Sequence, residues 1–321
     1  MKINTIFKPR NTRNTRKKLM KINNMFKKIF LLLILCLSIS CSRYKSDPQI
    51  EPYENLLTIV ADFNSHMYDD IYRFPYPRDV AGQNLYKATV VRLLNYKTLN
   101  SGKYDEIIYF KTAQAYERIG NYTNAIEMYN KVIEGKGKLK DEAQKRLPTI
   151  EEFHSIIDSP LNTDSLGEYL SSLEGRIANI EELSKKYKNT EYEPIALVEL
   201  ENAEIEYSLF LDANKYIIKD GINKALNQFD KMTKKFANSK NIYQHYLNLG
   251  DFYMRMAKEF AAIYSPESID FNLEEFNKYI DSARKYYLIV EQADGSDEKP
   301  EANAKLSALA SFSQKIRKLA K

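Results

Sequence analysis

Residues 109–137 read YFKTAQAYERIGNYTNAIEMYNKVIEGKG, a run of helix-forming residues with one turn signal near its middle. Small, turn-forming and aromatic residues stand at regular positions within it, namely Ala113, Tyr116, Gly120, Ala125 and Tyr129. Small side chains let two helices approach closely, and a glycine can end a helix because it has no Cβ. The tyrosines can then fill the groove between the helices. The stretch therefore predicts a hairpin of two packed helices.

The spacing of these residues resembles the tetratricopeptide repeat (TPR), in which a small residue, an aromatic residue, a turn and an A-x3-F/Y group follow in order. Val132 supplies the apolar residue three positions after Tyr129. Gly137 departs from the pattern, because the repeat often ends there with a proline. The resemblance implies two-helix repeats that stack into a solenoid.

Two further stretches follow the same pattern with longer connections between their helices. The second copy pairs residues 194–211 with residues 221–236. The third copy pairs the segment YLNLGDFYMRMA with the segment DSARKYYLIVE, across an insertion. The residues at the small and aromatic positions of these copies are Ala225, Phe229, Gly250, Tyr253, Ala283 and Tyr287.

The composition of the whole chain favours helices. Its 321 residues are 44% hydrophobic but include only 10 Gly and 10 Pro, and strand signals bounded by Asn-Gly or Asp-Gly turns are nearly absent. Few breakers and many Lys, Glu, Leu and Ala are typical of long helices. We therefore expect an all-α fold, an irregular TPR-like solenoid of helical hairpins over residues 53–321.

Two segments share the same helix-ending sequence. Residues 180–190 read IEELSKKYKNT and residues 229–239 read FDKMTKKFANS, each with Lys-Lys-aromatic before Asn-Thr or Asn-Ser. This ending is similar to the repeat ends of cell-envelope lipoproteins of the BamD and YbgF type. That resemblance implies a protein that works in the cell envelope beside other envelope proteins.

The N-terminal region carries a targeting signal, because residues 25–42 read MFKKIFLLLILCLSISCS. Lys27 and Lys28 precede an apolar run that is roughly half the length a transmembrane helix needs. Small residues and then Cys41 follow, as expected of a secretory signal. A cysteine placed directly after those small residues resembles the lipobox of bacterial lipoproteins.

The lipobox resemblance implies that a signal peptide, residues 1–40, is removed and that Cys41 carries lipid, including palmitate. Residues 41–52 then form a lipidated tether. Because Ser42 rather than Asp follows the cysteine, we expect the outer membrane rather than the inner, with the periplasmic or surface face left open. The alternative is an ordinary cleaved signal, which leaves Cys41 as a lone thiol in an oxidising compartment.

Charge is concentrated in the part that the signal removes. Residues 1–40 hold ten basic residues and no acidic one, so cleavage changes the net charge from +5 to −5. A mildly acidic chain lacks the electrostatic footprint of a nucleic-acid-binding protein. The basic start is long for a signal, and initiation at Met20 or Met25 would give it an ordinary length.

Nothing in the sequence has the spacing of an active site or a metal site. Cys36 and Cys41 are the only cysteines, and the three histidines are far apart. The dipeptide Glu267-Ser268 matches the start of a transglycosylase motif but lacks its continuation. We therefore expect no catalytic activity, no cofactor and no metal ion.

Aromatic residues are numerous, with 24 Tyr, 15 Phe and no Trp. We expect most tyrosines to fill TPR aromatic positions with the hydroxyl at the rim, and stacking on sugars or peptides is the alternative. Tyr72, Phe74 and Tyr76 flank prolines in DDIYRFPYPRD and do not follow helical spacing. They form a candidate partner loop, unless this loop packs against the first helices.

These observations predict a lipid-anchored cell-envelope scaffold, attached to the membrane through Cys41, that binds an envelope protein through TPR-like helices. The alternative is a surface lipoprotein that binds a glycan or a peptide. SusD-like nutrient lipoproteins also use TPR-like helices, but they are longer and stack sugars on Trp, which this chain lacks.

Overall fold

The computed structural model describes residues 52–69 and 80–320, and helices are the only regular elements in those two ranges. This confirms the predicted all-α class. The chain divides into two compact units, Met1–Asn55 and Leu56–Lys321. The second unit contains every helix except the first turn of the first one.

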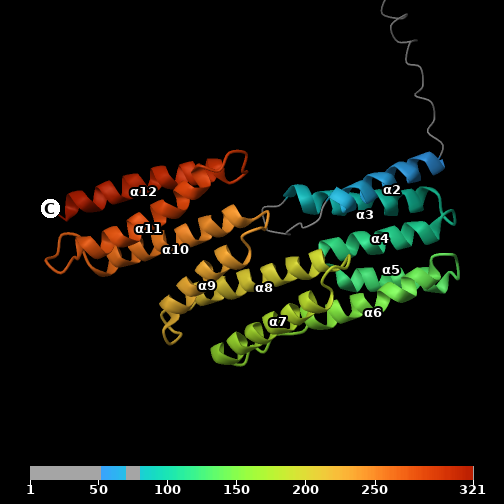
Figure 1. Ribbon diagram of the computed structural model, residues 1–321, viewed down its shortest axis with the longest axis horizontal. Coiled ribbons are helices and arrows are strands. Elements are labelled where there is room, and N and C mark those ends of the chain that lie inside the picture. Colours follow the sequence, from blue (N-terminus) through green and yellow to red (C-terminus); the bar gives the residue numbers. More distant parts are fainter. Residues whose placement is uncertain (1–51, 70–79, 321) are drawn as a thin grey trace, which may run out of the picture. The chain divides into compact units, whose positions relative to one another are not determined.

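Eleven helices lie within the described residues and are labelled in Figure 1. They are α2 (Pro52–Asp69), α3 (Val80–Leu99), α4 (Asp105–Ile119), α5 (Tyr122–Glu134), α6 (Lys140–Ile157), α7 (Leu166–Lys186), α8 (Glu193–Ala213), α9 (Gly221–Lys235), α10 (Ile242–Ile263), α11 (Leu273–Glu291) and α12 (Lys299–Leu319).

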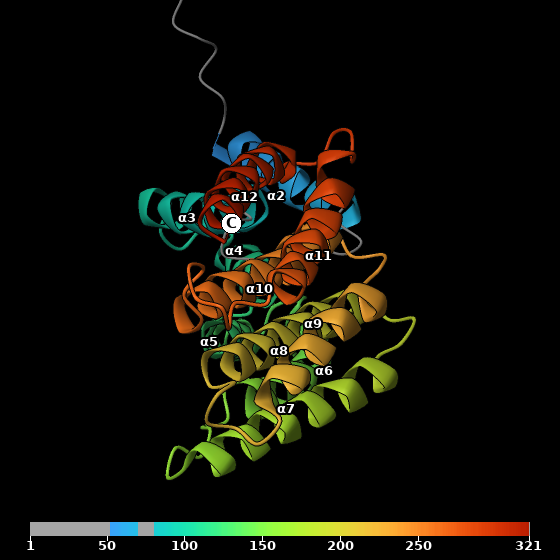
Figure 2. The same ribbon diagram turned by 90° about the vertical axis from the view of Figure 1, so that its left-hand side faces the viewer.

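From α3 onward, each helix packs against the next helix along the chain. The last three helices show this clearly, because the chain turns back after α10 and again after α11 (Figures 1 and 2). Among these three, α12 also contacts α10. Most of the hydrophobic core is therefore made between neighbours in sequence.

The α4–α5 hairpin forms where the sequence predicts it. Gly120 ends α4 with a left-handed backbone (φ 76°), and its N–H donates to the Glu117 carbonyl at 3.1 Å. Asn121 begins α5, and its side chain accepts from the Asn124 N–H at 3.2 Å. A glycine and an Asx cap in succession reverse the chain within one short turn.

The start of α6 depends on a side chain from α4. The Leu139 N–H donates to Glu106 Oε1 at 2.5 Å. A Cβ added to Gly137 would lie 2.2 Å from the same oxygen, so a larger residue there would require the Glu106 carboxylate to shift. Gly137 therefore lets the Glu106 carboxylate lie close to the backbone at the start of α6.

The two further predicted copies correspond to the pairs α8–α9 and α10–α11. Longer connections join them, residues 214–220 in the first pair and residues 264–272 in the second. The repeated Lys-Lys-aromatic sequences lie at helix ends, because Tyr187 and Phe236 are the C-terminal capping residues of α7 and α9.

Helices α10 and α11 approach each other closely at Gly250. A Cβ built on Gly250 would lie 2.6 Å from the ring of Tyr287, which is a fully buried side chain of α11. The tyrosine ring therefore lies directly over the backbone of α10. A packed ring cannot move away without disturbing its other neighbours.

We predict that Gly250→Ala lowers the free energy of unfolding by about 1–3 kcal/mol, because the added methyl group overpacks against the Tyr287 ring. Gly175→Ala is the matched control, since Gly175 lies within α7 with no atom near its added Cβ. That change should stabilise the protein by up to about 1 kcal/mol through helix propensity. Thermal unfolding followed by circular dichroism measures both, and equal midpoints would contradict the close contact.

Candidate functional site

The structure places the predicted repeat-packing residues at contacts between helices. Ala113, Ala125, Ala225 and Ala283 have no exposed surface. The aromatic residues divide into two groups: Tyr129, Tyr287 and Phe229 are buried, whereas Tyr116 and Tyr253 are partly buried at the edge of the core. The remaining two predicted residues are the turn glycine Gly120 and the close-contact glycine Gly250.

Four predicted site residues lie outside the described residues. These are the lipidation residue Cys41 and the candidate partner loop Tyr72, Phe74 and Tyr76.

The structure brings together a set of groups that the sequence analysis missed. Seven tyrosine hydroxyls donate to a carboxylate elsewhere in the fold, and two of these pairs, Tyr287–Asp251 and Tyr207–Glu174, measure 2.7 Å. The other five pairs are Tyr122–Glu199, Tyr129–Glu117, Tyr169–Glu206, Tyr187–Glu152 and Tyr216–Glu259.

Each of these bonds joins two different helices, or a helix to a connecting segment. The prediction that the tyrosine hydroxyls lie at the rim of the groove is wrong for Tyr129, which is fully buried and donates to a buried carboxylate. Partners lie between 12 and 77 residues apart in sequence. No local pattern in a single sequence identifies acceptors at such separations.

The most enclosed pair is Glu117 on α4 and Tyr129 on α5. The Tyr129 hydroxyl donates to Glu117 Oε1, and only 4% of Glu117 is exposed. Arg146 on α6 lies 3.8 Å from the other carboxylate oxygen. The same guanidinium donates from Nη2 to both carboxylate oxygens of Glu191 at 2.7 Å. One buried carboxylate therefore links three consecutive helices.

Two of the carboxyl groups titrate far from their ordinary range. Burial raises the pKa of Glu117 to about 7, against the opposing effects of Arg146 and the Tyr129 hydroxyl. Burial likewise raises the pKa of Glu199 to about 7, although the Tyr122 hydroxyl donates to it at 2.6 Å. Desolvation disfavours the charged carboxylate more than these partners stabilise it.

A carboxyl group with a pKa near 7 is suited to proton transfer, so each of these two is a candidate acid or base. Glu117 is covered by the fully buried Tyr129, which already occupies its oxygen. Glu199 packs against the turn at Gly120, where an added Cβ would lie 2.9 Å from its Oε1. The geometry therefore favours a structural role, in which both groups join α4 and α5 to α6 and α8.

Residues 52–69 and 80–320 contain neither a candidate metal site nor a candidate membrane-spanning helix. No group of three His, Cys, Asp or Glu side chains in these ranges could hold a metal ion. No helix there is long and apolar enough to cross a membrane.

The raised pKa of Glu117 predicts a pH-dependent stability. The carboxyl group titrates near 4.5 in its ordinary state and at about 7 in the folded protein. The folded state binds more protons between these values, so stability should fall as pH rises from about 5 to about 8. Glu117→Gln should remove its share of this fall, about 2–3 kcal/mol, because the amide keeps the Tyr129 hydrogen bond but does not titrate.

Thermal unfolding at the two ends of this pH range measures the effect. Glu127→Gln is the control, since Glu127 pairs with Lys131 on the exposed side of α5 and should leave the slope unchanged. An equal loss of stability with pH in wild type and Glu117→Gln would show that Glu117 titrates normally.

The sequence matches no protein-family model and no curated protein sequence. The resemblance to TPR-containing envelope lipoproteins therefore stays a prediction that rests on the residues quoted above.

Proposed function

We propose that the protein is a lipid-anchored scaffold of the cell envelope whose helical hairpins, arranged as a TPR-like solenoid, bind a protein partner. The observation that carries this proposal is the packing of each helix against its neighbour in sequence from α3 to α12. Folds built in this way expose a long surface for partners and need no reaction centre.

The described residues supply the interior that such a scaffold needs. Close contacts at alanines and glycines, together with tyrosine–carboxylate bonds, hold consecutive helices in fixed positions. Rigid helices lower the cost of ordering a binding surface when a partner arrives.

Exposed apolar side chains at the end of α10 offer places to detect a partner. Ile263 is 65% exposed and Tyr264 45% exposed, and Ile269 in the next connection is fully exposed. The connection before α9 contributes Tyr216, whose hydroxyl donates to Glu259 of α10 at 2.6 Å. Exposed apolar groups of this kind are common at protein interfaces.

The proposed anchor rests on the sequence around Cys41. A lipid on this cysteine would hold the protein at a membrane more firmly than a single myristoyl chain does, because a lipoprotein anchor buries more hydrocarbon. The scaffold would then meet its partner within the envelope.

We predict that wild-type protein sediments with membranes and that a photo-crosslinker at Ile263 captures an envelope protein in cells. Cys41→Ala should release the protein into a soluble fraction or block its processing, and the crosslinked product should disappear because the two proteins no longer meet. Fractionation followed by mass spectrometry of the crosslinked product measures both effects.

The control places the same crosslinker at Leu99, which is 84% exposed at the end of α3 and far from Ile263 in sequence. A processed Cys41→Ala protein that stays in the membrane would contradict the lipid anchor. Wild-type protein that forms no product with another protein at Ile263, Tyr264 or Ile269 would contradict the proposed surface. Stabilisation of the protein by a glycan or a short peptide alone would favour the ligand-binding alternative.

A further inference from the structure

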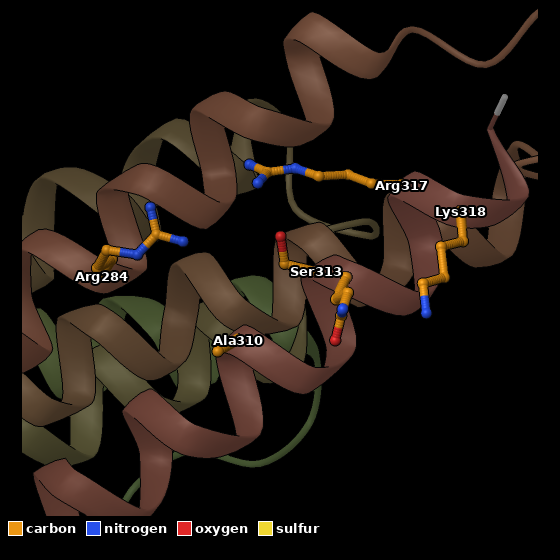
Figure 3. Close-up of a pocket in the computed structure, with 6 residues that line it drawn as sticks. Arg284, Ala310, Ser313, Arg317 and Lys318 are labelled. Carbon is orange, nitrogen blue, oxygen red and sulfur yellow. The ribbon is translucent and has the colours of Figure 1, made fainter.

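The last two helices line an open, basic pocket of about 390 Å³. Figure 3 shows the side chains that line it, with the Arg284 and Arg317 guanidinium groups and the Ser313 hydroxyl directed toward the same space. Arg284 comes from α11 and the other lining residues come from α12: Ala310, Ser313, Gln314, Arg317 and Lys318.

Arg317 is held in position without losing its charge. Its Nε and Nη2 donate to Asn277 Oδ1 of α11 at 3.0 and 2.8 Å. Asn277 is a neutral residue, so it orients the guanidinium but leaves the positive charge uncompensated. A guanidinium fixed by a neutral acceptor is prepared to bind an anion with its remaining N–H groups.

Arg284 faces the pocket from the opposite helix. Its Nη1 donates to Asp281 Oδ1 at 2.7 Å, in a pair where the Asp281 side chain is 62% exposed. Exposed ion pairs of this kind contribute little free energy, so the pair can be shared with a ligand. Three cations and one carboxylate leave two net positive charges around the pocket.

Ser313 supplies an uncharged donor to the same space. The residue is only 2% exposed, and its hydroxyl lies on the side of the pocket in Figure 3. Serines within a helix usually donate to the carbonyl four residues earlier, as Ser307 and Ser311 of the same helix do at 3.0 Å. The Ser313 hydroxyl can instead donate to an anion in the pocket.

The surrounding sequence adds to this positive charge. Residues 302–321 contain five basic residues and no acidic residue. Cations at the end of a helix are also favoured by the helix dipole, and this accounts for Arg317 and Lys318. The dipole does not account for Arg284, which belongs to another helix, or for the hydroxyl of Ser313.

We propose that this pocket binds a phosphate dianion, either as free phosphate or as the head group of an anionic lipid. A doubly charged phosphate balances the net charge, accepts from both guanidinium groups and can accept from the Ser313 hydroxyl. Planar guanidinium groups match the oxygens of phosphate well, and bonds between charged partners are the stronger kind. The site goes beyond the proposed scaffold function, and its test uses neither the anchor nor the partner.

The test is isothermal titration of the full chain, in a non-ionic detergent, with inorganic phosphate. We expect saturable binding to one site, weakened about tenfold by Arg317→Gln and by Arg284→Gln, because each change removes a charged contact. Ser313→Ala should weaken binding severalfold without any change in net charge. Lys315→Gln is the matched control, since Lys315 lies on the same helix but does not line this pocket.

Three results would overturn the proposal. One is the absence of saturable phosphate binding, and another is equal weakening by Lys315→Gln and Arg317→Gln, which indicates diffuse attraction of ions. The third is unchanged binding in Ser313→Ala.

Vesicles of phosphatidylcholine with and without phosphatidic acid then distinguish free phosphate from a lipid head group as the ligand. Preference for phosphatidic acid that Ser313→Ala removes assigns the pocket to a lipid head group, and phosphate binding without that preference assigns it to free phosphate.

Discussion

The hydrogen bond from a tyrosine hydroxyl to a carboxylate on another helix is the interaction on which this fold depends most. Seven such bonds occur among the described residues, and the residues that form them lie between α4 and α11. A bond to a charged acceptor contributes about 1.5–3 kcal/mol, roughly twice the contribution of a bond between neutral groups. A buried carboxylate that loses its donor instead destabilises the fold.

Two of these bonds lie beside a glycine that lets a side chain approach the backbone closely. Gly250 leaves room for the Tyr287 ring, and the hydroxyl of that ring donates to the next residue, Asp251. Asp251 also accepts from Lys305 of α12 at 2.7 Å, so one carboxylate joins α10, α11 and α12. In a similar way, Gly120 leaves room for Glu199, which accepts from Tyr122. Close approach of the backbones is what brings the donor within reach of the acceptor.

The local signals in the sequence predict the helices well, because each depends on residues near one another in the chain. Gly120 and Asn121 form a turn whatever the rest of the fold does, and the burial of Ala113 and Ala125 follows from their positions in that hairpin. The all-α class follows from composition for the same reason.

The missing predictions concern contacts between distant segments. Helix α6 contains Pro148, which in a sequence indicates a helix break, and it begins on a carboxylate supplied by Glu106 from α4. Glu117 carries no sign in the sequence that Tyr129 and Arg146 will enclose it. Ser313 likewise resembles any other helical serine until its neighbours on α11 are known. These features depend on tertiary packing, and a local sequence pattern does not show which distant segments pack together.

The most direct test of this account is the unfolding free energy of Tyr287→Phe compared with Tyr253→Phe. Both changes remove one hydroxyl and keep the ring, but the Tyr287 hydroxyl donates to Asp251 at 2.7 Å. Tyr253 stacks on Tyr286 with ring centroids 5.9 Å apart, and its hydroxyl has no hydrogen-bond partner within the described ranges. We expect a loss of about 1.5–3 kcal/mol for Tyr287→Phe and less than about 0.5 kcal/mol for Tyr253→Phe. Equal effects of the two substitutions would contradict it.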